Sequence, residues 1–116
     1  MSEPQIVSNS GLSLSISVAP EATVVRCRGN LVYQNSAFLK SEVKSRIPAK
    51  GCLTLDLTDV TRMDSSGLGT LVALYLSARS KSCELSLINL NKQIRELLAI
   101  SNLLSIFETV GSIRMP

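Results

Sequence analysis

Apolar and polar residues alternate along several short stretches of the chain, and this period of two predicts β-strands. In the stretch 12–18, apolar residues alternate strictly with serines, which predicts a half-exposed strand near an edge of a sheet. The short turn at Pro20-Glu21 predicts that this strand pairs with the next one as an antiparallel hairpin. The further strands are expected at 23–28, 52–57, 84–88 and 105–109.

Apolar residues spaced three and four apart predict three helices among the later strands. The first begins near Ser36, which can cap it, and ends at Ile47 before Pro48. The third begins near Asn91. The second should bury one face, formed by Leu68, Leu71, Val72, Tyr75 and Leu76. This order of elements predicts an α/β fold, with a mixed, mostly parallel sheet of about five strands and three crossover helices.

The chain of 116 residues is long enough for one hydrophobic core and therefore for one domain. Residues 1–11 are polar and contain Pro4, so we expect a flexible N-terminal tail, followed by a single domain over residues 12–116. Apolar residues make up 45% of the chain but aromatic residues only 3%, which predicts an aliphatic core.

The charge and cysteine patterns argue against several classes of function. The net charge of +3 is mild and scattered, and with no Trp, two Tyr and two Phe the chain lacks the features of a nucleic-acid-binding protein. Cys27, Cys52 and Cys83 have no metal-binding spacing, so we expect buried, reduced thiols. No signal peptide or apolar run of about 20 residues is present, which predicts a cytoplasmic protein that does not insert into membranes.

The most specific stretch of the chain is a strand, a turn and a helix over residues 52–76. The turn contains the sequence Asp64-Ser65-Ser66-Gly67-Leu68-Gly69. Asp and Ser side chains accept hydrogen bonds from the unpaired N–H groups at the start of a helix, and the glycines leave the hydroxyl groups accessible. Taken alone, this sequence usually marks only an ordinary capped helix start without a further function.

The segment Leu55–Val60, followed by Met63–Gly69, resembles the signature of the STAS domain, and among its members the bacterial anti-sigma factor antagonists. The resemblance extends from about Leu12 to Val110, and it includes Gly29-x-Leu31 after the second strand and Asn89-Leu90-Asn91 before the last helix. It implies a single-domain STAS-like fold.

The resemblance also implies a function as a binding protein rather than an enzyme, without a cofactor or metal. The unphosphorylated protein would bind an anti-sigma factor that is also a serine kinase, and this would release a sigma factor for transcription. Ser66 corresponds to the serine that the kinase phosphorylates, a serine phosphatase would reverse the reaction, and the expected partner-binding residues are Asp64, Ser65, Gly67 and Leu68. Phosphorylation would add about −1.5 to −2 charges and weaken docking.

The chain departs from the family pattern at two places. Val32 occupies the position after Gly-x-Leu where relatives commonly carry an aspartate, so we expect kinase docking or phosphoryl transfer to differ. The segment 111–116 is too short for the amphipathic helix with which members often end, so that helix should be short or absent.

Two other classes of function remain open from the sequence. One is a STAS scaffold subunit of a larger signalling or transport assembly, which binds a partner without being phosphorylated. The other is a ligand-binding or catalytic protein in which Asp56, Asp59 and Asp64 hold a magnesium ion. A serine hydrolase triad is excluded because the chain has no histidine, and a Walker loop is excluded because no Lys follows the glycines at the required spacing.

Overall fold

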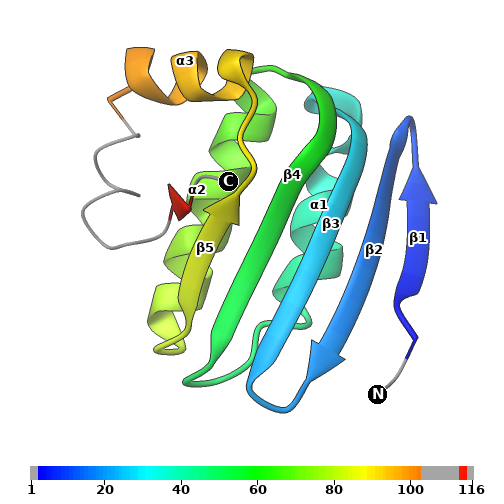
Figure 1. The fold of residues 1–116 in the computed structure, drawn as a ribbon, viewed down its shortest axis with the longest axis vertical. Helices are drawn as coiled ribbons and strands as arrows, with labels where there is room; N and C mark the ends of the chain where they lie inside the picture. Colours follow the sequence, from blue (N-terminus) through cyan, green and yellow to red (C-terminus); the bar gives the residue numbers. More distant parts are fainter. Residues whose placement is uncertain (1–2, 103–112, 115–116) are drawn as a thin grey trace.

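The computed structural model describes residues 3–102 and 113–114, which form an α/β fold with one sheet (Figure 1). The sheet has the order β1-β2-β3-β4-β5-β6. Its strands are β1 (Gln5–Asn9), β2 (Leu12–Ala19), β3 (Ala22–Leu31), β4 (Cys52–Met63), β5 (Glu84–Ile88) and β6 (Ile113–Arg114). The helices are α1 (Tyr33–Lys44), α2 (Ser65–Ser80) and α3 (Lys92–Ile100).

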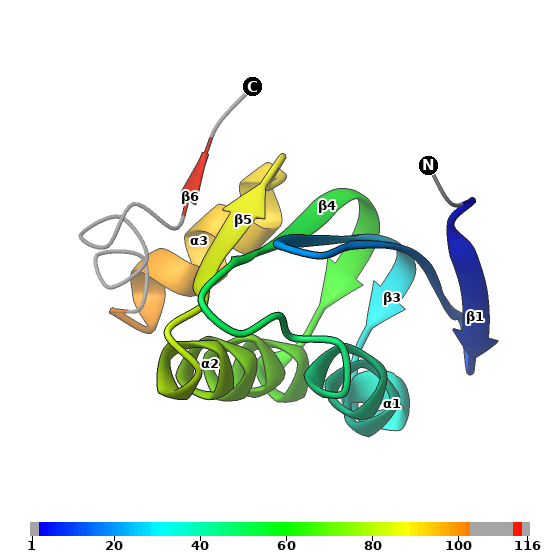
Figure 2. The same ribbon diagram turned by 90° about the horizontal axis from the view of Figure 1, so that it is seen from below.

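The sheet is mixed and mostly parallel, as predicted. β1, β2 and β3 pair antiparallel, whereas the pairs β3–β4, β4–β5 and β5–β6 are parallel. The parallel pairs are connected through α1, α2 and α3, which confirms the three crossover helices. Figure 2 shows α1 and α2 side by side against one face of the sheet, and Figure 1 shows α3 at the end of the sheet toward which β5 runs.

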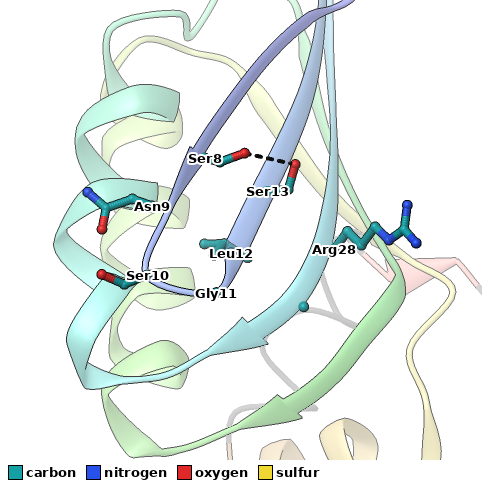
Figure 3. Close-up of a pocket in the computed structure, with 8 residues that line it drawn as sticks. Ser8, Asn9, Ser10, Gly11, Leu12, Ser13 and Arg28 are labelled. Atoms are coloured by element: carbon teal, nitrogen blue, oxygen red, sulfur yellow. Dashed lines mark hydrogen bonds between the residues drawn. The ribbon is translucent and has the colours of Figure 1, made fainter.

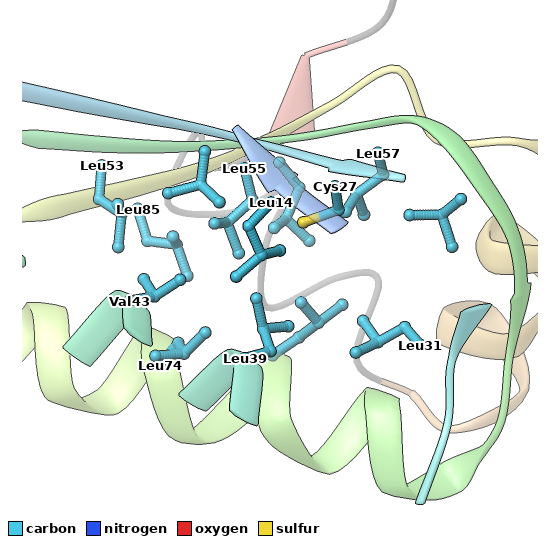
Figure 4. Close-up of a cluster of buried hydrophobic side chains, with 14 of the residues drawn as sticks. Leu14, Cys27, Leu31, Leu39, Val43, Leu53, Leu55, Leu57, Leu74 and Leu85 are labelled. Atoms are coloured by element: carbon cyan, nitrogen blue, oxygen red, sulfur yellow. The ribbon is translucent and has the colours of Figure 1, made fainter. Parts of the chain in front are cut away.

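The hydrophobic core lies between the sheet and the pair α1 and α2, and its side chains are almost all aliphatic (Figure 4). β4 supplies its centre, because alternate residues of this strand point toward the helices. These residues meet apolar side chains of α1 and α2, and the fully buried set includes Leu39, Val43, Leu53, Leu55, Leu57, Leu71 and Leu74. The aliphatic core expected from the composition is therefore present.

The N-terminal segment differs from the prediction, because Gln5–Asn9 form the edge strand β1 instead of a loose tail. The reason lies in the turn that follows, where Ser10 and Gly11 both have positive φ, at 48° and 86°. Two such residues match the twist of a tight antiparallel hairpin and allow even a polar segment to pair. As a consequence, β2 pairs with a neighbouring strand along both of its edges, and it is not the edge strand of the sheet.

β4 is longer than predicted, because it continues from 57 to Met63. The pairing with β3 shifts register twice, between Arg26 and Arg28 and between Gly29 and Asn30, and these irregularities return Val60 and Met63 to the buried face. The simple alternation of apolar and polar residues ends at this point, so the sequence predicted a strand that is too short.

The ends of the chain and of α1 also depart from the predicted boundaries. α1 begins at Tyr33 and not near Ser36, and it ends at Lys44 rather than Ile47. On α2, Leu76 of the expected buried face is exposed, and Leu74 and Ala78 are buried instead. The predicted strand at 105–109 lies outside the described residues, and the strand that pairs with β5 is Ile113–Arg114. Cys27 and Cys83 are buried as predicted, but Cys52 is exposed at the start of β4.

Within the part of the chain that the structure describes, no helix combines the length and the apolar character that crossing a lipid bilayer requires.

Candidate functional site

Asp64 joins the end of β4 to the start of α2 and caps the helix as predicted. Its Oδ1 atom accepts the backbone N–H of Ser66 at 2.9 Å and that of Gly67 at 3.1 Å. The backbone of Asp64 is extended, as expected for a residue immediately before a helix. The predicted strand-to-helix turn is therefore present, with its side chains in the capping geometry.

The second carboxylate oxygen of Asp64 reaches a different helix. Oδ2 accepts the backbone N–H of Tyr33, the first residue of α1, at 3.1 Å. The backbone N–H of Asp64 itself donates to the carbonyl oxygen of Leu31 at 3.3 Å. One carboxylate thus binds the N-terminal ends of both α1 and α2, and it fixes the position of one helix start relative to the other.

This second contact compensates for Val32, which precedes α1 and has no side-chain group that can cap it. Asn35 supplies the rest of the cap, because its Oδ1 accepts the Val32 N–H at 3.0 Å. The Asn35 Nδ2 donates to the carbonyl oxygens of Ser10 and Asn30, both at 2.9 Å. Asn35 is fully buried, and it connects the β1–β2 turn, the end of β3 and the start of α1. The sequence alone did not lead us to Asn35. A polar residue three positions after a capping position that lacks a polar side chain is a signal that could have identified it.

The Asp64 carboxylate is held in its charged form. Partial burial raises the pKa of Asp64, but the three backbone N–H groups and the positive charge of Arg62 outweigh burial and hold that pKa below its ordinary value. The charge is therefore present at neutral pH, and it lies against two helix ends that each carry a partial positive charge.

The two serines of the motif differ in exposure. Ser65 is exposed, and Ser66 is partly exposed at the second position of α2. The carbonyl oxygen of Ser66 accepts the hydroxyl of Thr70 at 3.1 Å, while no described side chain or backbone group forms a hydrogen bond with the Ser66 hydroxyl. The Ser66 hydroxyl is therefore not committed to the fold, and its backbone is fixed by Asp64.

Gly67 and Leu68 are buried, unlike Ser65 and Ser66. A Cβ atom on Gly67 would lie 2.4 Å from the carbonyl oxygen of Leu31, so only glycine fits this contact between α2 and β3. Gly69 is exposed, and a Cβ atom there would meet nothing within 4 Å. Burial gives Gly67 and Leu68 a packing role, and their predicted contact with a partner stays a prediction.

The other acidic residues considered for a metal site are separately engaged. Asp56 accepts the backbone N–H and the hydroxyl of Thr58, and the Nδ2 of Asn89 at 3.1 Å. Asp59 forms an ion pair with Arg26 at 3.1 Å. Among residues 3–102 and 113–114, no three His, Cys, Asp or Glu side chains are grouped so that they can hold a metal ion. Asp56, Asp59 and Asp64 are therefore not brought together as the magnesium alternative requires.

A hollow of about 520 Å³ lies at the β1–β2 turn (Figure 3). Its wall is formed by Ser8, Asn9, Ser10, Gly11, Leu12, Ser13, Arg28 and Gly29. The hydroxyl groups of Ser8 and Ser13 are hydrogen-bonded to each other at 3.3 Å, and the Arg28 side chain extends away from the turn. None of these lining residues belongs to the motif 64–69, so the motif is not part of this hollow.

Comparison with known proteins identifies the family of the chain. The sequence profile of the STAS domain matches residues 13–114, and the chain belongs to the STAS domain family. An anti-sigma F factor antagonist from Paenibacillus polymyxa is 29% identical over 85 residues, which are 72% of this chain and 73% of that protein.

Two solved structures share the fold. The anti-sigma factor antagonist SpoIIAA in its unphosphorylated form superposes with a TM-score of 0.71 at 16% identity, over 89% of this chain and 87% of that one. The murine anion transporter Slc26a9 superposes with a TM-score of 0.68 at 17% identity, over 82% of this chain but only 16% of the transporter. At these identities the likeness concerns the fold alone.

Proposed function

We propose that this protein is an anti-sigma factor antagonist that is controlled by phosphorylation of Ser66. In its unphosphorylated form it binds an anti-sigma factor that is also a serine kinase, and a sigma factor is thereby released. The observation that supports this most strongly is the Ser66 hydroxyl itself, which is partly exposed and has no described hydrogen-bond partner on a backbone fixed by Asp64. The similarity to an anti-sigma F factor antagonist supports the class of partner.

The position of Asp64 supports a switch that acts at the surface. A phosphate on Ser66 would bring about −1.5 to −2 charges close to a carboxylate that already occupies the N–H groups of Ser66 and Gly67. The phosphate would therefore find these N–H groups already occupied, and burying its charge in an interface would be costly. A thousandfold loss of affinity corresponds to about 4 kcal/mol, which is within the cost of burying an unpaired charge.

The proposal is tested with the anti-sigma factors encoded in the source genome. Each is purified and incubated with this protein and ATP, and phosphorylation is located by mass spectrometry of peptides. We expect one of these kinases to phosphorylate the wild type and Ser65→Ala at Ser66, and not to phosphorylate Ser66→Ala. Unchanged incorporation of phosphate in Ser66→Ala would contradict the assignment of Ser66 as the acceptor. Ser65→Ala is the matched control because Ser65 is the adjacent serine.

A second candidate function is a STAS scaffold subunit that binds a partner without being phosphorylated. Two observations favour it. The fold also occurs as a small part of the transporter Slc26a9, and Val32 stands where relatives commonly carry an aspartate. The same experiment separates the two functions, because a scaffold would bind its partner equally well before and after incubation with kinase and ATP.

A further inference from the structure

Tyr33 is an aromatic side chain placed on the surface without a packing role. Its exposed fraction is 78%, in a chain that has only two Tyr, two Phe and no Trp. Phe38 and Tyr75, by contrast, are partly buried against the core. An exposed aromatic ring contributes little to folding, but such rings are frequent at the centres of protein interfaces, where they supply much of the binding energy.

The backbone of Tyr33 is fixed relative to Ser66. The Asp64 Oδ2 atom accepts the Tyr33 N–H at 3.1 Å, and Oδ1 accepts the Ser66 N–H at 2.9 Å. The two residues are 33 positions apart in the sequence and yet are bound to one carboxylate. A partner that contacts Ser66 therefore meets Tyr33 in a defined place, and it loses little conformational entropy in ordering the backbone there.

The charge around this carboxylate is positive. Arg62 is exposed, its charge lowers the pKa of Asp64, and it forms no ion pair with the described residues. The starts of α1 and α2 each contribute about half a positive elementary charge, and neither helix has an acidic residue in its first turn. Since Asp64 contributes one negative charge, the sum is about one positive elementary charge.

Building on the proposed function, we propose that Tyr33 and Arg62 form a recognition surface together with Ser66. The surface fits a partner with an apolar pocket for the tyrosine ring and carboxylate groups at the rim of that pocket, opposite Arg62. Tyr33 is the anchor, Arg62 provides charge complementarity, and Asp64 is a positioning residue because its oxygens are directed to the two helix starts.

Phosphorylation of Ser66 would reverse the sign of this surface. Adding about −1.5 to −2 charges to a sum of about +1 leaves a negative surface. A partner with carboxylates at its rim would be attracted to the first form and repelled by the second. The recognition surface thus gives a reason why one modification blocks docking without a large conformational change.

The test measures binding by titration calorimetry, with the anti-sigma factor that binds the wild-type chain. Tyr33→Ala should weaken binding about thirtyfold, whereas Tyr33→Phe, which keeps the ring, should weaken it less than threefold. Arg62→Gln should weaken binding about fivefold and reduce its dependence on salt concentration. Leu76→Ala is the matched control, because Leu76 is an exposed apolar residue on α2 that lies outside this surface.

The possible results separate this inference from the proposed function. If an anti-sigma factor binds the wild type and Tyr33→Ala with equal affinity, the recognition surface is wrong while the proposed function stands. If Tyr33→Ala binds weakly but no kinase modifies Ser66, the surface stands and the phosphorylation switch is wrong. If no anti-sigma factor from the source genome binds the wild type, both are overturned. Circular dichroism of each variant verifies that the fold is retained.

Discussion

The carboxylate of Asp64 accepts the backbone N–H of Tyr33 across a separation of 31 residues, while its other oxygen caps α2. This contact makes Asp64 a structural residue of two helices at once. A carboxylate in this position satisfies N–H groups that otherwise have no partner within their helix. Asp64 is therefore expected to stabilise the fold as well as to arrange the surface around Ser66.

Two replacements of Asp64 should destabilise the protein to different extents. Asp64→Ala removes the caps of both helices, and we expect a loss of about 2 kcal/mol in the free energy of unfolding. Asp64→Asn keeps an oxygen for α2, but its amide group cannot accept the Tyr33 N–H, so a loss of about 1 kcal/mol is expected. Urea unfolding followed by circular dichroism measures both.

The control for these variants is Asp59→Asn, which removes a largely exposed ion pair with Arg26. Exposed pairs of this kind contribute about 0–1 kcal/mol, so this variant should be close to the wild type. In ¹H–¹⁵N spectra, Asp64→Asn should shift the Tyr33 amide signal strongly. A Tyr33 signal that does not move would contradict the contact between the two helices.

The stability should depend on pH through Asp64 and Asp56. The pKa of each is lowered in the folded protein, for Asp56 because hydrogen bonds from Thr58 and Asn89 and the charge of Arg26 outweigh its partial burial. A lowered pKa means that the unfolded chain binds more protons in acid, so the stabilisation is present above the unfolded pKa of about 3.9 and is lost as the pH falls through the folded pKa.

This dependence can be measured from urea midpoints between pH 6 and pH 2.5. We expect little change down to about pH 4 and a decline below it. The decline should be shallower in Asp64→Asn, because one of the linked groups no longer titrates. An equal slope in the variant and the wild type would show that Asp64 is not linked to folding.

Asn35 is the second polar residue on which the arrangement depends. Its amide group binds the N–H of Val32 and the carbonyl oxygens of Ser10 and Asn30 from a fully buried position. Asn35→Ala should cost about 2–3 kcal/mol, since the lost bonds include partly buried groups without another partner. Ser36→Ala, one position further along α1, is the control and should change the stability by less than about 0.5 kcal/mol.

The sequence predicted those parts of the fold that depend on local periodicity. The three helices, the core strands and the capping by Asp64 and Asn91 follow from apolar spacing and from the preference of Asp and Asn for helix starts. β1 was missed because pairing of a polar segment depends on the positive φ values of Ser10 and Gly11, which the alternation of residues does not reveal.

The candidate site was predicted only in part, for a related reason. The motif from Asp64 to Gly69 is contiguous, so it could be recognised in the sequence. Tyr33 and Asn35 belong to the same arrangement only through the contacts of α1 with Asp64 and with the β1–β2 turn. Such contacts are long-range, and no local pattern around Tyr33 indicates that its N–H is bound by Asp64.

The three cysteines should differ in reactivity, because only Cys52 is exposed. Burial raises the pKa of the Cys27 thiol to about 12, and burial also raises the pKa of Cys83. Reaction with a thiol-specific reagent at pH 8 should label Cys52 in the native protein, and all three only in denaturant. Rapid labelling of Cys27 without denaturant would contradict the position of β3 in the sheet.

The two glycines of the motif should respond in opposite ways to the same substitution. Gly67→Ala places a Cβ atom 2.4 Å from the Leu31 carbonyl oxygen, and because this oxygen belongs to the backbone, the helix must move away from β3. We expect a loss of more than about 2 kcal/mol. Gly69→Ala meets no atom within 4 Å, and alanine favours a helix by about 1 kcal/mol over glycine, so this variant should be more stable than the wild type. Both lie within one turn of α2, so each serves as the control for the other in urea unfolding.

If both variants were stabilised, α2 would not pack against Leu31 as closely as the structure shows. If both were destabilised, the surface at Gly69 would not be open, and the exposed face around Ser66 would have to be revised.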